Sequence, residues 1–235
     1  MFTKKSAAKS ILDNTKKIYA GPHCYNLVEA ESFSHLDLNF YEKTMREIEA
    51  QGFRYVADVE NLTLKESLMD PRTFIRTGLS FDGTTASAHY QVKPRIWWRV
   101  IFWLTGTKLS KAIDFETEFG DGSFVTTSNA IMAGLWDSPP LIQAEFMPPE
   151  TSAEMLFERH RSRVEEHIYV RNTRPIQLFS LPEILESQHR MEAIKSEFRA
   201  RVGWIKKSEW DRLSDNPNAT TDDIYDEFKD LQREN

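Results

Sequence analysis

Two Asp-Gly pairs, Asp82-Gly83 and Asp121-Gly122, each separate two segments in which apolar and polar residues alternate. Alternation with a period of two is typical of a strand with one buried face, and an Asp-Gly pair between two such strands predicts a tight hairpin. A type I′ turn needs positive φ at both central residues, which glycine adopts freely. The expected strands are 73–81, 84–92, 112–119 and 123–130.

If both loops contain two residues, the turns also fix which residues face each other across each hairpin. In the first hairpin Ile75 then pairs with Tyr90, and in the second Phe115 pairs with Ser128. Each hairpin has one more apolar and one more polar face, so we expect amphipathic helices to cover one face of the sheet only. The side chains expected to face these helices are Leu79, Tyr90, Phe115 and Phe124.

Helical periodicity and capping residues predict the covering helices. Asn39 is an N-cap candidate for a helix that ends at Gly52, and Ser180 begins a capping box for a helix that ends at Gly203. Further helices are expected over 151–172 and after Thr221, and residues 53–59 are expected to add a fifth strand. The fold class is therefore α+β, with an antiparallel sheet of four or five strands built from the two Asp-Gly hairpins.

Composition bounds the organisation of the 235 residues. No linker rich in Pro, Gly or Ser interrupts the chain, so we expect a single α+β domain over 1–235, with a frayed basic segment at 1–20 and a short helical extension at 205–235. A net charge of −6 disfavours nucleic acid as a partner. A single cysteine, Cys24, and no apolar signal region favour the reducing cytoplasm.

Three carboxylates, Asp114, Glu116 and Glu118, alternate along one expected strand and so project from the same face. If the two hairpins are neighbours, Arg76 and His89 share that face. Arg76, His89, Asp114 and Glu116 would then bind an anionic or polar ligand, although alternating exposed charges are also common without any function. The chain contains no phosphate-binding loop, nucleophile elbow or Cys/His metal motif, so no cofactor and no metal is expected.

The segment Lys93–Lys111 (KPRIWWRVIFWLTGTKLSK) concentrates aromatic side chains between basic ones. Its apolar part, Ile96–Leu104, is too short to cross a bilayer, which takes about 20 helical residues. We favour burial or a protein contact for this segment over a membrane surface, and either over nucleic-acid stacking. The residues expected to make a partner or membrane contact are Trp97, Trp98, Arg99, Phe102 and Trp103.

Three functions follow from these features. The preferred interpretation is a non-catalytic protein that binds a protein partner or a small polar ligand. The first alternative is a small-molecule hydrolase or isomerase in which His89 acts with Glu116 or Glu118 on the polar sheet face. The second is a protein associated peripherally with a membrane surface, from the cytoplasmic side, through Ile96–Leu104.

Overall fold

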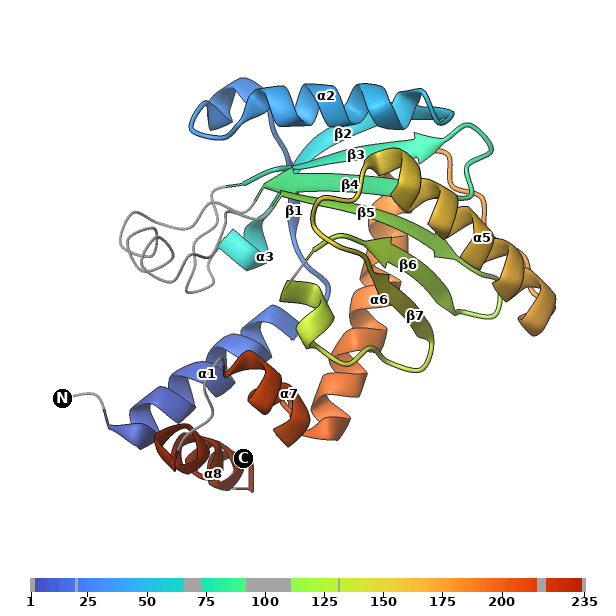
Figure 1. Ribbon diagram of the computed structural model, residues 1–235. Helices are drawn as coiled ribbons and strands as arrows, with labels where there is room; N and C mark the ends of the chain where they lie inside the picture. Colours follow the sequence, from blue (N-terminus) through green and yellow to red (C-terminus); the bar gives the residue numbers. More distant parts are fainter. Residues whose placement is uncertain are drawn as a thin grey trace.

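A computed structural model describes residues 3–19, 21–65, 73–91, 111–130, 132–214 and 219–233. Within these residues the chain forms an α+β fold built on a seven-stranded sheet (Figure 1). The strands are β1 Tyr25–Leu27, β2 Phe53–Asn61, β3 Ile75–Ser80, β4 Ala86–Gln91, β5 Lys111–Glu118, β6 Phe124–Ser128 and β7 Ile142–Phe146. They lie side by side in chain order. All neighbours are antiparallel except β6 and β7, which are parallel. The expected antiparallel sheet of four or five strands lacked β1, which has only three residues, and the parallel strand β7.

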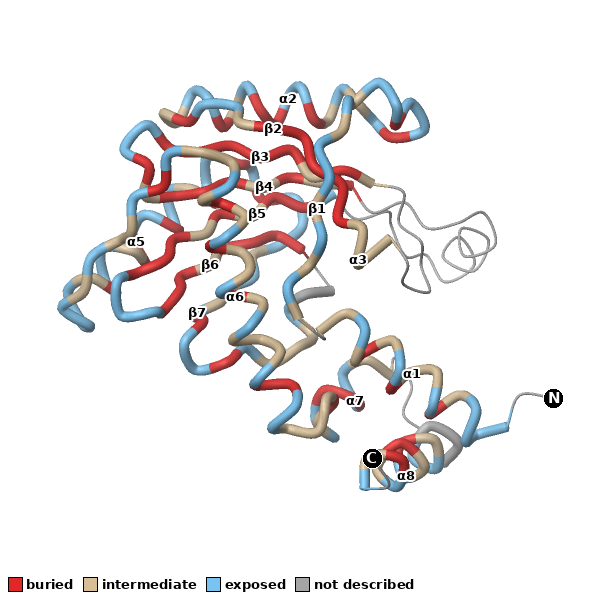
Figure 2. Tube along the Cα trace, turned by 180° about the vertical axis from the view of Figure 1, so that it is seen from behind, coloured by how far each residue is buried: buried red, intermediate tan, exposed pale blue. Residues whose placement is uncertain are grey.

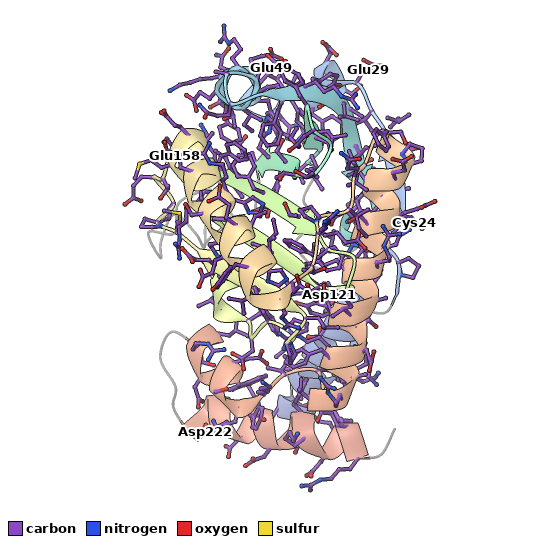
Figure 3. All side chains as sticks on the ribbon, turned by 90° about the vertical axis from the view of Figure 1, so that its right-hand side faces the viewer. Cys24, Glu29, Glu49, Asp121, Glu158 and Asp222 are labelled. Carbon is purple, nitrogen blue, oxygen red and sulfur yellow. The ribbon has the colours of Figure 1, made fainter. Side chains whose placement is uncertain are left out.

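Helices pack on both faces of this sheet, so the expectation that one face alone is covered was wrong. The helices of the described residues are α1 Lys4–Tyr19, α2 Leu38–Glu49, α3 Leu62–Lys65, α5 Ala153–Arg171, α6 Leu181–Val202, α7 Lys207–Leu213 and α8 Ala219–Arg233, with short 3-10 turns η1 Ala30–Phe33 and η2 Met132–Leu135. Seen along the sheet, α5, which carries Glu158, and α6 lie on opposite sides of it (Figure 3). None of the helices in the described ranges has both the length and the apolar composition needed to span a bilayer.

Each face of the sheet has its own core. Phe115 packs with Met45 of α2 and Leu156 of α5 on one face. On the other face Leu79 packs with Ile184 of α6, and Phe124 with Met191 of the same helix. Most strand residues are therefore buried (Figure 2). Helices can cover both faces of β3 and β4 because the polar side chains of these two strands are mostly small or hydrogen-bonded. The alternation of apolar and polar residues alone does not reveal this.

The first hairpin has the predicted register, with Ile75 opposite Tyr90. Its turn is not type I′, because Asp82 lacks the positive φ that this turn requires. Gly83 has φ +74°, and its N–H donates to the carbonyl of Ser80 at 2.9 Å. The N–H of Ser80 donates to the carbonyl of Thr85 at 2.9 Å, so the loop consists of the residues between these two. This loop is longer than the predicted Asp82-Gly83 loop, but the strand register is the predicted one.

The second hairpin is shifted by one residue from the prediction, since Phe115 pairs with Thr127 rather than Ser128. Phe119 N–H donates to the carbonyl of Ser123 at 2.9 Å, which leaves a three-residue loop, Gly120–Gly122. Such loops combine a type I turn with a left-handed residue, here Gly122 at φ +77°. A shift of one residue exchanges the faces of the partner strand, so Ser128, not Asn129, lies opposite Asp114.

The two turn glycines offer a matched test of this geometry. An alanine at Gly122 meets open space, so Gly122→Ala should cost only the left-handed backbone penalty, about 1–2 kcal/mol. At Gly83 a Cβ would lie 2.5 Å from the carbonyl oxygen of Leu178. Gly83→Ala should therefore destabilise by clearly more than Gly122→Ala in urea denaturation. Equal losses would contradict the close approach of Leu178 to this turn.

The helix boundaries are mostly as predicted. Residues Tyr41, Met45 and Ile48 form the buried face of α2, although its N-cap is Asp37, whose carboxylate accepts from Phe40 N–H at 3.2 Å. Helix α6 follows Ser180 and ends at Gly203, which has φ +74°. The expected capping box is absent, because Ser180 makes no side-chain cap hydrogen bond and Glu183 accepts from the N–H of Phe179.

The basic N-terminal segment, expected to be frayed, is helical over Lys4–Tyr19. Ala8 and Leu12 of α1 are buried against Phe228 of α8. The region 205–235 contains two helices, α7 and α8, and α1, α7 and α8 gather at the C-terminal end of α6 (Figure 1).

Candidate functional site

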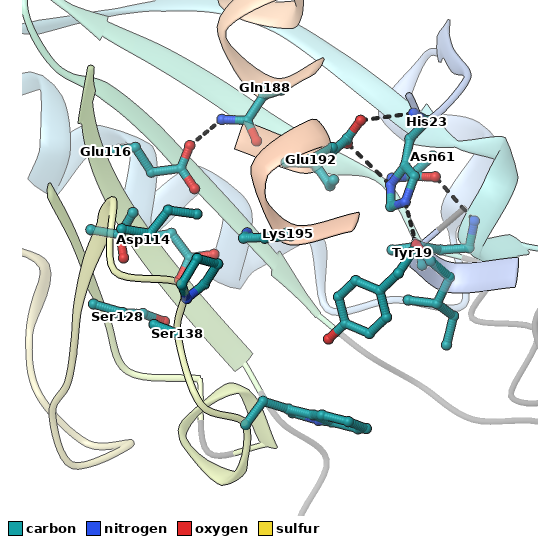
Figure 4. A pocket seen from close by; sticks show the side chains of 18 of the residues that line it. Tyr19, His23, Asn61, Asp114, Glu116, Ser128, Ser138, Gln188, Glu192 and Lys195 are labelled. Carbon is teal, nitrogen blue, oxygen red and sulfur yellow. Dashed lines mark hydrogen bonds and ion pairs between the residues drawn. The ribbon is translucent and has the colours of Figure 1, made fainter. Parts of the chain in front are cut away.

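A cavity of about 390 Å³ lies between the sheet and α6, on the face opposite α2 and α5. Its remaining walls come from the end of α1, the segment that leads to β1, and the connection from η2 to β7 (Figure 4). Apolar groups such as Ile75, Trp136 and Ile142 line much of it. Its principal polar side chains are Tyr90, Asp114, Glu116, Ser128, Gln188, Glu192 and Lys195.

Strand alternation places Asp114 and Glu116 on the cavity side of β5. Each faces small residues on the neighbouring strands. Asp114 lies between Ala88 of β4 and Ser128 of β6, while Ala86 and Thr126 flank Glu116. No large cross-strand neighbour therefore covers either carboxylate, and their accessible surface faces the cavity.

Asp114 is the most perturbed acid of the site. Burial raises the pKa of its carboxyl group to about 7, with a further increase from the charge of Glu116, against the opposing effects of Ser128, Lys195 and Tyr90. The hydroxyls of Ser128 and Tyr90 approach this carboxyl, but Oδ1 is buried without any hydrogen-bond partner. The negative charge of Asp114, together with burial, raises the pKa of Tyr90, so its phenol stays protonated. A buried oxygen of this kind is costly unless something binds to it.

Lys195 extends from α6 toward the two carboxylates (Figure 4). Its positive charge lowers the pKa values of both Asp114 and Glu116, although burial raises each of them overall. Among the described residues, Lys195 nevertheless forms neither an ion pair nor a hydrogen bond with them. The side-chain amide of Gln188 donates to Glu116 instead. The ammonium group of Lys195 and the carboxyl group of Asp114 thus both face the cavity but form no ion pair across it.

A second polar group closes the end of the cavity near α1. The carboxylate of Glu192 accepts from the backbone N–H of His23 and from the hydroxyl of Tyr25, both at 2.7 Å. His23 Nε2 donates to the carbonyl of Ile18 at 2.7 Å, and Asn61 donates to Nδ1 at 2.8 Å. His23 Nδ1 also lies 3.2 Å from Glu192 Oε1. These bonds tie α1, β1, β2 and α6 together, and all are internal to the protein.

His89 does not share a face with the carboxylates, so that part of the predicted site was wrong. In the pairing of β4 with β5, Ala88 lies opposite Asp114 and His89 opposite Ile113. His89 is fully buried under α2, where Nε2 donates to the carbonyl of Tyr41 at 3.2 Å. Burial lowers the pKa of His89 to about 3, so this ring is neutral at physiological pH.

Arg76 and Glu118 are also engaged elsewhere. Arg76, on the same face as His89, donates to both oxygens of Asp58 at 2.9 and 2.8 Å. Glu118 accepts two hydrogen bonds from Arg190 of α6, at 2.6 and 2.8 Å. Of the predicted polar site residues, therefore, only Asp114 and Glu116 line the cavity, while Arg76 and His89 lie opposite each other on the other face of the sheet. The described residues contain no group of three or more His, Cys, Asp or Glu side chains arranged to hold a metal ion.

Sequence reasoning missed the contribution of α6. Gln188, Glu192 and Lys195 stand at positions i, i+4 and i+7, which share one helical face. A polar stripe on a helix that is otherwise expected to pack on a sheet is the signal that was available. It indicates a helix that covers a polar cavity and not a dry core.

The proposed contact residues of the aromatic segment, Trp97, Trp98, Arg99, Phe102 and Trp103, lie outside the described residues. The nearest described residues are Gln91 and Lys111, which pair with each other at the ends of β4 and β5. The expectation of a partner or membrane contact there stays a prediction.

Comparison of the chain with family models, with curated proteins and with solved structures found no match. The site must therefore be interpreted from its own chemistry.

Proposed function

We propose that the protein binds a small organic molecule in the cavity between the sheet and α6. One observation carries the proposal: Asp114 and Lys195 face each other inside a largely apolar cavity without forming an ion pair. Cavities of about 300–1,000 Å³ with apolar walls and a few convergent polar groups are typical of small-molecule sites.

The lining restricts the chemistry of the ligand. Ile75, Trp136 and Ile142 offer apolar contacts for its body. At the polar end, Asp114 can accept a hydrogen bond and Lys195 can donate one. Glu116 and Glu192 add negative charge to the same walls, which disfavours an anionic ligand. An uncharged molecule with an apolar ring or chain and one polar end group fits these constraints best.

The proposal is tested by screening uncharged bicyclic aromatic fragments by ligand-observed NMR and thermal shift. Fragments that bind should raise the melting temperature, because they bind the folded state alone. Ala144→Leu, which enlarges a side chain of the cavity wall, and Lys195→Met should each weaken binding by about tenfold or more. Lys43→Met, an exposed change on α2, serves as the matched control. If the fragments bind Ala144→Leu and Lys195→Met as tightly as they bind the parent protein, the site lies elsewhere and the proposal is refuted.

A further inference from the structure

The geometry points to a proton-transfer enzyme: Asp114 removes a proton from carbon in a molecule bound in the cavity, and Lys195 stabilises the negative charge that develops. This inference rests on the ligand site proposed above. It replaces His89, which lies on the other face of the sheet, by a base that the cavity itself contains.

Asp114 is the carboxylate of the cavity best suited to act as a base. A general base needs a free lone pair within reach of the substrate. Glu116 accepts a hydrogen bond from Gln188, and Glu192 accepts from Tyr25 and from the backbone of His23. Asp114 alone among these three keeps a buried oxygen, Oδ1, without a partner.

The environment also strengthens Asp114 as a base. Burial removes water from the carboxyl group and raises its pKa to about 7, so that near neutral pH a large fraction is ionised and still basic. A base whose pKa lies near the working pH combines availability with driving force. The neighbouring Tyr90 stays protonated, since its pKa is raised by the charge of Asp114 and by burial, and its hydroxyl donates to the Asp114 carboxyl.

Lys195 places a positive charge in the cavity but is not paired with Asp114 before the substrate binds. Its ammonium group acts on Asp114 through its field but forms no ion pair with it in the described part of the chain. A fixed cation in a site that excludes water is worth most where charge appears during the reaction. The substrate oxygen or nitrogen that gains charge is therefore expected next to Lys195, with the acidic C–H bond directed toward Asp114.

The step is balanced without any co-reactant. The C–H bond breaks, the proton moves to Asp114, and the electron pair moves into the substrate toward an electron-withdrawing group. The proton then returns to a different carbon, which completes an isomerisation, or a leaving group departs and Asp114 releases the proton to water. The substrate class is an uncharged compound with a C–H bond acidified by a carbonyl group or a heteroatom ring.

The probe for this activity is 5-nitrobenzisoxazole, an uncharged bicyclic carbon acid. Loss of its ring C–H proton to a base forms a nitrile, breaks the N–O bond and leaves a coloured phenolate, so no other reactant is required. The protein is expected to accelerate this reaction by about 100-fold or more over free acetate at the same concentration. The rate should rise with pH as the Asp114 carboxylate forms, with a midpoint near its pKa of about 7.

Variants separate the roles of the two groups. Asp114→Asn, with circular dichroism to verify folding, should reduce turnover to the background rate, whereas Asp226→Asn, the same change on an exposed residue of α8, should leave turnover unchanged. Lys195→Met should lower kcat by about tenfold or more and keep the pH midpoint within about one unit. Lys43→Met again serves as the control. Turnover that survives in Asp114→Asn would overturn the inference.

Binding of the same probe, measured by saturation-transfer NMR, distinguishes the two proposals. Binding without turnover overturns the catalytic role of Asp114 and leaves the ligand site standing. If an uncharged probe of this size does not bind at all, both the ligand site and the inference that rests on it are refuted. Binding together with turnover that depends on Asp114 supports both.

Discussion

Arg199→Met is expected to lower the free energy of unfolding by about 3–5 kcal/mol, because it leaves a buried carboxylate without its cation. Arg199 and Glu209 have side chains only 3% and 0% exposed, and Arg199 Nη1 lies 2.6 Å from Glu209 Oε1. Arg199 Nη2 also donates to the carbonyl of Asp137 at 2.5 Å, and its guanidinium lies 4.9 Å from the centre of the Trp136 ring. One side chain thus ties α6, α7 and the η2 region together.

Urea denaturation measures this loss, and Arg159→Met is the matched control. Arg159 also forms two hydrogen bonds with a carboxylate, that of Glu145, but the two side chains are 46% and 32% exposed. Exposed pairs of this kind contribute about 0–1 kcal/mol. The double variant Arg199→Met/Glu209→Leu should be more stable than Arg199→Met, since no unpaired charge remains. If Arg199→Met costs no more than Arg159→Met, the buried pair does not hold this region together.

Asp114→Asn is expected to stabilise the protein at pH 8, by about 3–4 kcal/mol, and to have little effect at pH 4. The folded-state pKa of Asp114 is about 7, well above the value of about 3.9 expected for the unfolded chain. Well below pH 4 the carboxyl group is protonated in both states, and at pH 4 the unfolded chain has begun to release its proton. As the pH rises toward 7 the unfolded chain releases its proton first, so the folded state progressively loses stability. Asparagine stays neutral and avoids this loss.

Denaturation of both proteins at several pH values between 4 and 8 gives this difference directly. Asp226→Asn, on the surface of α8, should show no comparable pH-dependent gain. A stability difference between Asp114→Asn and the parent protein that is the same at pH 4 and pH 8 would show that Asp114 is not held in its protonated form by burial. Under the proposed role of Asp114 as a base, such a loss of stability is the common trade-off between stability and activity.

The two hairpins show which parts of a sheet local sequence can specify. The alternating runs and the Asp-Gly pairs predicted both hairpins, and the first has the expected register. The second differs because its loop has three residues, Gly120–Gly122, of which only the last has the positive φ that favours glycine. The local sequence is compatible with a two-residue or a three-residue loop. The choice is made by the pairing of the whole strands, which no short segment contains.

The candidate site was predictable in the part that lies within one strand. Asp114 and Glu116 share a face because alternation along β5 is a local property. Whether His89 or Ala88 lies opposite Asp114 depends on how β4 pairs with β5, and the turns within each hairpin do not determine the pairing between hairpins. Lys195 comes from a helix far along the chain, and its place over the cavity depends on tertiary packing.

The position of α1 has a consequence for the exchange kinetics of the ligand proposed above. Ile18 and Tyr19 at its C-terminal end line the cavity, while the body of the helix packs chiefly on α8 through Ala8 and Leu12. Elements held by few contacts with the main core can open locally while the rest of the protein stays folded. The rate at which a ligand leaves is then coupled to the local stability of the α1–α8 pair. Residues that never touch the ligand would set how long it stays.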